Sequence, residues 1–176
     1  MGRLSASLAA LAALVGLLST QAIPAPALDT PNERITLVGL TAVHVVVYDM
    51  SPEAERESLT RSALQAEVEQ RLRRAGLRAL GPSDALRSRG RPTLELRLNV
   101  ARSRDAQPLY VYSVDLALRQ KVQLTRARTI ESFAITWSEP PEVGTVEPAR
   151  LSVVLDAVRA KADQFIAAWH AANPDH

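Results

Sequence analysis

The clearest pattern in the chain is the alternation of apolar and polar residues between Thr93 and Arg102. Every second position from 94 to 100 is leucine or valine, and Glu95, Arg97 and Asn99 lie between them. Successive side chains of a strand point to opposite faces of its sheet. The segment is therefore predicted to be a strand with one buried face and one solvent-facing face.

Two further segments, 110–124 and 129–137, alternate in the same way. Together with the first they predict an antiparallel meander that is covered on one face only. In the last segment Phe133, Ile135 and Trp137 share one side of the strand, and we expect all three to point into the core.

The pairing of the first two strands can also be predicted, because apolar face must meet apolar face. One register places Glu95 opposite Asp115, which brings two like charges together. The neighbouring register places Arg97 opposite Asp115, an opposite-charge pair that stabilises the ladder by roughly 0.2–1 kcal/mol. We predict the second register, with a connecting loop centred on Asp105 and Ala106.

The first half of the chain predicts a long helix between two parallel strands. Residues 42–48 are β-branched and nearly all apolar, which is typical of a strand in the middle of a sheet. Ser51-Pro52-Glu53 is a helix start, and apolar residues recur on one face as far as Gly76. This predicts a helix of about 24 residues, a short strand over 77–80 parallel to the first strand, and a loop over 81–92.

A second helix is predicted to begin at Pro148 and to end at Asn173-Pro174, after a turn over residues 138–148. The resulting order of elements predicts an α+β fold. We expect a two-layer sandwich in which a mixed, mostly antiparallel sheet of four to five strands carries two long helices on one face.

Residues 1–27 have the layout of a secretory signal peptide, with cleavage expected after Ala22 or Ala27. The apolar run from Leu8 to Leu18 is shorter than the about 20 residues that a membrane-spanning helix needs. We expect a flexible segment over 28–34, a single domain over 35–172 and a tail over 173–176. The mature chain is predicted to be soluble, without a transmembrane anchor, in the bacterial periplasm or outside the cell.

The sequence contains no cysteine, which excludes disulfides, thiolate metal sites and a lipid-modified cysteine. Apart from the missing lipid-modified cysteine, the order of elements and the segment ERESLTRSALQAEVEQRLRRAGLRAL (55–80) resemble small bacterial envelope accessory proteins. Their α/β sandwich is that of the lipopolysaccharide-assembly and curli-secretion lipoproteins. The resemblance extends over most of the mature chain as topology and implies a partner-binding accessory protein. It implies no outer-membrane anchor and transfers no functional residue.

Candidate chemistry is sparse. The sequence has no G-x-S-x-G, H-E-x-x-H, phosphate-binding glycine loop or dinucleotide fingerprint. We therefore predict no catalytic residue, no cofactor, no metal ion and no enzymatic activity. His44 is expected to be hydrogen-bonded within the first strand rather than to bind a ligand. Glu95 and Asp115 could form an acid pair on the solvent-facing side of the sheet, which leaves a hydrolase as the less favoured interpretation.

Arginine is dense between positions 71 and 91, where Asp84 is the only acid, although the whole chain carries a net charge of only +2. Arginines in the last turn of a helix interact favourably with its dipole, which explains part of the cluster without a function. An export signal argues against nucleic acid, and the segment has no aromatic residue on which a base could stack. The candidate patch comprises Arg71, Arg74, Arg78, Arg87, Arg89 and Arg91.

Two functional hypotheses follow. The first is an envelope accessory protein that binds another protein through a sheet edge or through the exposed sheet face, whose candidate residues are Glu95, Arg97, Asp115 and Arg119. The second is a binder or carrier of anionic lipid or lipopolysaccharide that uses the arginine-rich end.

Overall fold

The computed structural model describes residues 31–48, 50–56, 59–103 and 109–175. The predicted signal peptide and its cleavage sites lie outside these residues, as does the loop centred on Asp105 and Ala106.

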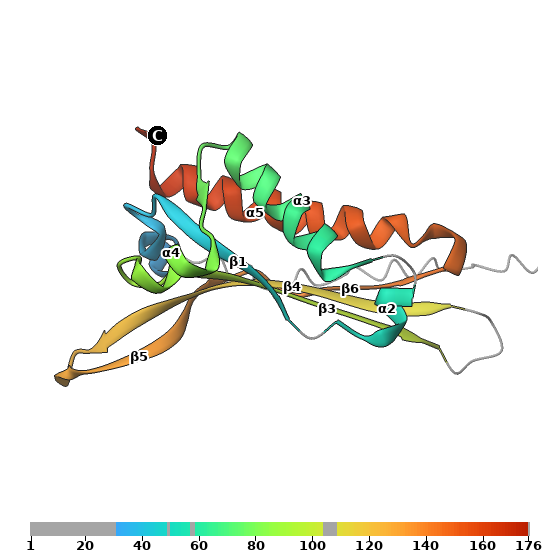
Figure 1. Ribbon diagram of the computed structural model, residues 1–176, viewed down its shortest axis with the longest axis horizontal. Coiled ribbons are helices and arrows are strands. Elements are labelled where there is room, and N and C mark those ends of the chain that lie inside the picture. The colour runs from blue at the N-terminus through green and yellow to red at the C-terminus, as the bar shows by residue number, and fades with distance from the viewer. Residues whose placement is uncertain (1–30, 49, 57–58, 104–108, 176) are drawn as a thin grey trace, which may run out of the picture.

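The described chain forms an open mixed sheet with two longer helices on one face (Figure 1). The strand order is β2-β1-β3-β4-β5, and β6 also pairs with β4. β1 runs parallel to β2 and β3, whereas β4 is antiparallel to β3, β5 and β6. The strands are β1 (Ala42–Tyr48), β2 (Arg78–Ala79), β3 (Thr93–Arg102), β4 (Tyr110–Leu124), β5 (Ala127–Ser138) and β6 (Glu142–Val146).

The α+β class is confirmed, and the sheet has six strands in place of the four to five predicted. The helices that cover it are α3 and α5, and no helix in the described part of the chain is both long and apolar enough to cross a membrane. The helical elements are α1 (Pro31–Arg34), η1 (Ile35–Leu37), α2 (Pro52–Arg56), α3 (Arg61–Arg74), α4 (Pro82–Arg87), η2 (Pro148–Arg150) and α5 (Ser152–Ala172).

The single long helix predicted from Pro52 to Gly76 is wrong, because two helices occupy this region. α3 begins anew after Thr60, whose hydroxyl accepts a hydrogen bond from the Ala63 N–H at 3.2 Å. A hydroxyl side chain competes for backbone donors in this way and starts a new helix. α2 instead lies beside β3, where the Ser51 hydroxyl donates to the Val100 carbonyl at 2.6 Å.

α1 lies within the segment 28–34 that was expected to be flexible, and α4 and β6 lie where only irregular chain was predicted. α4 begins at Pro82 in the expected loop, because proline suits the first turn of a helix and Asp84 favours its N-terminal end. β6 lies in the expected turn. It pairs with Tyr110–Val114 because β4 is 15 residues long and β5 occupies only its other half.

β5 and β6 thus follow one another along the same edge of β4, separated by Glu139, Pro140 and Pro141. The Lys161 side chain of α5, only 5% exposed, donates from Nζ to the Pro140 carbonyl at 2.7 Å. This hydrogen bond fixes the break between the two strands against the helix layer.

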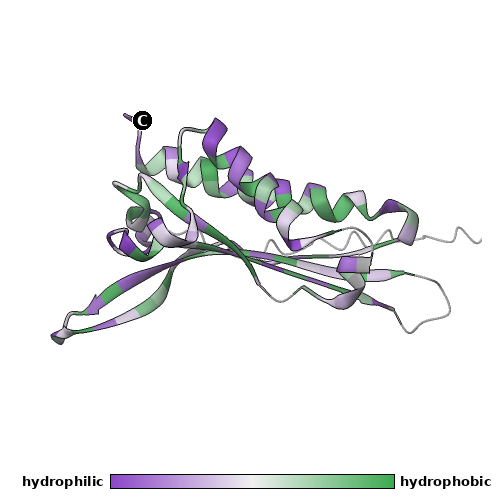
Figure 2. Ribbon diagram, viewed as in Figure 1, coloured by the Kyte–Doolittle hydropathy of each residue, from purple (hydrophilic) through white to green (hydrophobic). Residues whose placement is uncertain are grey.

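The predicted register of β3 and β4 is confirmed. Arg97 lies opposite Asp115 and Leu98 opposite Val114, and the leucines of β3 are buried. The predicted parallel return of the short strand β2 beside β1 is also confirmed. Figure 2 shows hydrophobic and hydrophilic residues alternating along the strands.

The core lies between the sheet and the α3–α5 layer. Its largest side chains include Trp137 of β5 and Phe165 of α5, whose rings meet edge to face at 5.0 Å between centroids. At the end of α5, Trp169 Nε1 donates to the Leu40 carbonyl at 2.7 Å. Asn173 is buried just beyond, so the C-terminal end of α5 is fixed to the segment that precedes β1.

The β4–β5 hairpin continues beyond the end of β3 as a projecting arm, residues 120–135 (Figure 1). A β-bulge lies at its base, because Leu118 pairs with Trp137 but Arg119 pairs with Ile135. The extra residue reverses the direction of the side chains that precede Thr136 on β5. Phe133 and Ile135 therefore point away from the core, and the prediction that they face inward is wrong.

Candidate binding surfaces

The sheet face opposite α3 and α5, here called the open face, carries all four predicted sheet-face residues. Glu95 and Arg97 come from β3, and Asp115 and Arg119 come from β4. They lie together because each is an outward position of the alternating pattern in two paired strands. These four residues therefore form one contiguous group of charges, and their role in binding a partner stays a prediction.

These charges form an ion-pair network centred on Glu95, which is only 4% exposed. Arg119 Nε lies 2.5 Å from Glu95 Oε1, and Arg97 Nη2 donates to Glu95 Oε2 at 3.1 Å. Arg97 Nη1 is also 3.9 Å from Asp115 Oδ2. Arg97 thus bridges the two carboxylates. The charges of this network are neutralised, and Glu95 and Asp115 do not face each other directly.

Next to this network lies an apolar area that sequence analysis missed. Phe133 and Ile135 of the arm are 44% and 52% exposed, and Leu86 of α4 is 65% exposed. The guanidinium of Arg119 lies over the Phe133 ring, 5.2 Å from its centroid. A hollow of about 300 Å³ at this place is lined by His44, Pro82, Ala85, Leu86, Arg91, Thr93, Arg119 and Phe133.

His44 is hydrogen-bonded, as predicted. Its Nδ1 lies 2.8 Å from the Leu80 carbonyl oxygen, which only accepts, so Nδ1 carries the proton. The sequence signal for α4, proline at the start of a turn with an acid two residues later, was present in residues 82–84. No sequence signal marks the bulge that turns Phe133 outward.

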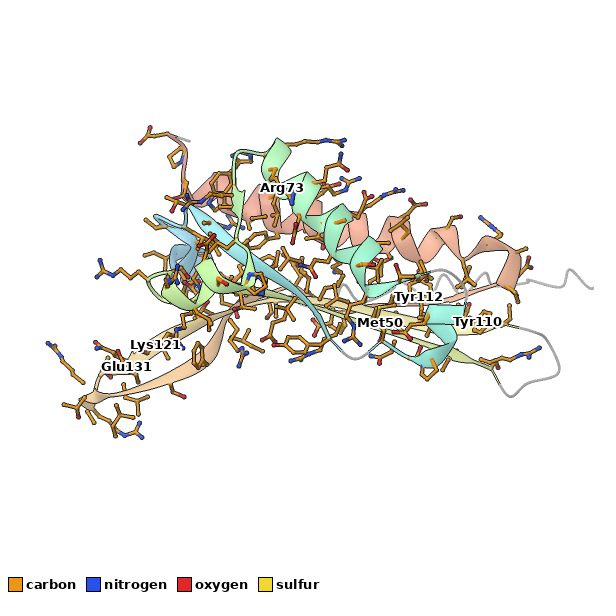
Figure 3. The ribbon with its side chains drawn as sticks, in the orientation of Figure 1. Met50, Arg73, Tyr110, Tyr112, Lys121 and Glu131 are labelled. Atoms are coloured by element: carbon orange, nitrogen blue, oxygen red, sulfur yellow. The ribbon has the colours of Figure 1, made fainter. Side chains whose placement is uncertain are left out.

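β5 is the last strand of the described sheet on this side. The Thr36 hydroxyl donates to the Thr136 carbonyl at 3.0 Å, so η1 covers the edge of β5 at the base of the arm. Further out, Lys121 and Glu131 form an ion pair across the two strands of the arm (Figure 3). The arm is thus held as a paired hairpin.

The predicted arginine patch divides into two parts. Arg71 on α3 donates to both carboxylate oxygens of Asp163 on α5, at 2.6 and 2.8 Å, and also contacts Glu67. Arg73 pairs with Glu69 one turn earlier. Arg74 is exposed on the last turn of α3. Arg71 is therefore neutralised within the helix layer and does not contribute a free positive charge.

The remaining patch residues, Arg78, Arg87, Arg89 and Arg91, surround α4 and the loop that follows it. Arg78 and Arg89 line a cavity of about 400 Å³, and Arg78 and Arg87 line a second of about 350 Å³. Arg89 and Arg91 line a third of about 500 Å³ together with Lys121. The structure thus brings these four arginines together around adjoining cavities.

The ion pairs between α3 and α5 should make the stability of the protein depend on pH. A hydrogen bond from Arg159 lowers the pKa of the Glu67 carboxyl below its ordinary value of 4.5; partial burial opposes this and Arg71 adds to it. A carboxyl whose pKa is lower in the folded state contributes stability above its unfolded pKa and loses it as the pH falls. Urea unfolding should therefore show the stability difference between wild type and Glu67→Gln staying constant above about pH 5.5 and shrinking as the pH falls through 4.5 and below it. A difference that does not vary with pH would contradict the role of this ion pair.

No protein-family model matches the chain, and no curated protein matches it. A PelC dodecamer from Paraburkholderia phytofirmans is a structural match with a TM-score of 0.40 and 14% identity, covering 73% of this chain and 87% of that one. A second PelC dodecamer structure from the same organism has a TM-score of 0.34 and 14% identity, with coverages of 61% and 74%. A minor lipoprotein from Acinetobacter baumannii has a TM-score of 0.36 and 6% identity, with coverages of 73% and 91%. The three matches are partial likenesses in fold, and no functional residue transfers from them.

Proposed function

We propose that the chain is a non-enzymatic accessory protein of the bacterial cell envelope that binds another protein through the open face and the adjoining β5 edge. The observation that carries this proposal is the outward rotation of Phe133 and Ile135 by the bulge at Thr136. Without the bulge, alternation would have directed both side chains to the opposite face.

The composition of the surface suits a protein partner. Interface centres are enriched in aromatic residues and arginine, and a few such residues account for most of the binding energy. Phe133 with Arg119 stacked over its ring is such a pair, and Leu86 extends the apolar area onto α4. The neighbouring charges Glu95 and Arg97 are already paired, so a partner that covers them leaves no unpaired charge at this point.

The edge of β5 supports the same function. An exposed strand edge presents free N–H and C=O groups to which a segment of another protein can add as a further strand. In the arm this edge lies beside Phe133 and Ile135, so main-chain pairing and apolar anchoring would reach the same partner segment. The envelope location rests on the signal-peptide pattern of residues 1–27.

The test is site-specific photo-crosslinking in the source cells with benzoylphenylalanine at position 133 or 130. Ile130 is 50% exposed on the same strand but lies one residue from Glu131, on the opposite side of the arm from Phe133. We expect a discrete protein adduct from position 133 and none from position 130. Adducts of equal intensity at both positions would overturn the proposal.

Affinity for the purified crosslinked partner then gives the energetic test. Phe133→Ala combined with Ile135→Ala should raise Kd by at least about tenfold, because two exposed anchors are removed. Ile130→Ala, the matched control, should change Kd by less than about twofold. If the two variants change Kd equally, the open face is not the binding surface.

A further inference from the structure

The geometry points to a second binding site at the other side of α4, which takes the phosphate group of a phosphate ester. This site, called the arginine hollow, consists of the two adjoining cavities of about 400 and 350 Å³ that share Arg78, Leu80 and Ser88. Arg87 and Arg89 complete its positive lining. The inference goes beyond the proposed function, because these cavities do not include Phe133, Ile135 or Leu86.

The lining of the hollow is rich in positive charge. Arg78, Arg87 and Arg89 are exposed, and none of them forms an ion pair within 4.0 Å with a carboxylate of the described residues. Among the residues that the structure describes, Asp84 is the only acid that lines either cavity. Three like charges around one concave surface repel each other, and a bound anion removes this repulsion.

The loop that carries Arg89 is held in a strained conformation. Gly90 has φ +76° and Arg91 has φ +45°, a left-handed conformation that is uncommon for a residue with a side chain and is disfavoured before proline. Two backbone hydrogen bonds fix the loop, from Lys121 N to Gly90 O at 2.7 Å and from His44 N to Pro92 O at 2.9 Å. Strain of this kind is retained where surrounding structure enforces it, which is common at binding sites.

Neutral hydrogen-bond groups also line the hollow. Arg78 N and Leu80 N donate to carbonyls of the β1 side at 3.4 and 2.8 Å, so strand alternation directs the Ala79 N–H outward from the sheet edge. Ala79 lines the smaller cavity. Thr36, Thr41 and Gln120 add polar side chains to the larger one. The Thr36 hydroxyl and the Gln120 amide already donate hydrogen bonds within the protein. The Ala79 N–H and the Thr41 hydroxyl are therefore the neutral donors that the hollow offers beside its guanidinium groups.

These features select the ligand class. A phosphate monoester carries a charge of about −1.5 to −2 at neutral pH and has three acceptor oxygens. It can therefore accept hydrogen bonds from several guanidinium groups at once, which suits this site better than a single carboxylate. Val38, Leu40, Leu80 and Pro92 supply apolar wall beside the arginines. The cavity exceeds the space of a phosphate alone, so the ester group also has room. The phosphate could belong to a lipid headgroup or to a water-soluble ester.

The test uses the purified chain with two kinds of probe. Glycerophosphate binding is measured by calorimetry, and sedimentation is measured with phosphatidylcholine vesicles that contain or lack phosphatidic acid, whose phosphate is also a monoester. Binding of glycerophosphate identifies a soluble ester as sufficient, whereas binding of phosphatidic acid vesicles alone identifies a lipid headgroup. Either result supports the proposal. If neither probe binds, the proposal is overturned.

The variant Arg78→Gln/Arg89→Gln assigns the binding to the hollow, and Arg126→Gln/Arg128→Gln at the tip of the arm removes the same charge elsewhere. We expect the first to weaken binding at least about tenfold and the second less than about twofold. Equal loss in both variants would mean non-specific attraction and would overturn the site. Crosslinking at position 133 does not involve these residues, so failure here leaves the protein-binding proposal testable on its own.

Discussion

Replacing Phe165 with alanine is expected to lower the free energy of unfolding by about 3–5 kcal/mol, the usual cost of removing a buried aromatic ring. Phe165 is fully buried on α5 and its ring meets Trp137 of β5 edge to face. It therefore joins the helix layer to the sheet at the level of the bulge. Phe165→Leu retains most of the apolar volume and should cost less than the alanine variant.

The chain offers a matched control, because its only other phenylalanine is Phe133. Phe133→Ala removes the same atoms from the open face and should cost less than about 1 kcal/mol, chiefly its contact with Arg119. Urea unfolding followed by circular dichroism measures both variants. If the two alanine variants were equally destabilised, Phe133 would belong to the core and the bulge would be wrongly placed.

The second large effect is expected at Asn173. Its Oδ1 accepts from Gly39 N at 2.7 Å, and its Nδ2 donates to the carbonyls of Leu37 and Trp169 at 2.9 Å each. Asn173→Ala removes three hydrogen bonds at a buried position and should cost about 2–4 kcal/mol. Asn173→Asp keeps the acceptor but sets a charged carboxylate oxygen against the carbonyls of Leu37 and Trp169 at a buried position, so at neutral pH it should be at least as destabilised as the alanine variant.

Asn99→Ala is the control for this prediction. Asn99 lies exposed on β3, and its amide donates a long hydrogen bond to the Ser113 hydroxyl at 3.4 Å. Its loss should change the unfolding free energy by less than about 0.5 kcal/mol. Tryptophan fluorescence is a suitable probe, because Trp169 adjoins the Asn173 contacts. An equal cost at both asparagines would contradict the assigned role of the C-terminal segment.

The register of β3 and β4 could be predicted because two independent requirements agreed. Burial of the leucines fixed the faces, and the charges of Glu95, Arg97 and Asp115 selected one of the remaining alignments. The broken helix was harder to foresee, since apolar periodicity after Leu64 is compatible with a start at Pro52 or at Thr60. The choice between them depended on α2 packing beside β3, a tertiary contact.

The binding surfaces were predictable only as sets of charges. Arg71 is neutralised by Asp163, which lies 92 positions further along the chain. Neighbouring residues in the sequence therefore could not reveal that Arg71 adds no free positive charge to the patch. Arg78 and Arg89 converge because β2 returns beside β1, which the sequence did suggest. The outward turn of Phe133 depends on one extra residue at Thr136, and residue types on either side of that position suit both alignments.

The break between β5 and β6 has a consequence for self-association. A long, unprotected strand edge allows copies of a protein to stack into continuous intermolecular sheets, which leads to aggregates. Here the outer edge is divided at Pro140 and Pro141, which have no N–H to donate. Lys161 already occupies the Pro140 carbonyl from within the molecule. The edge can therefore accept one short strand beside the arm, while an uninterrupted ladder from the tip of β5 to the end of β6 cannot form.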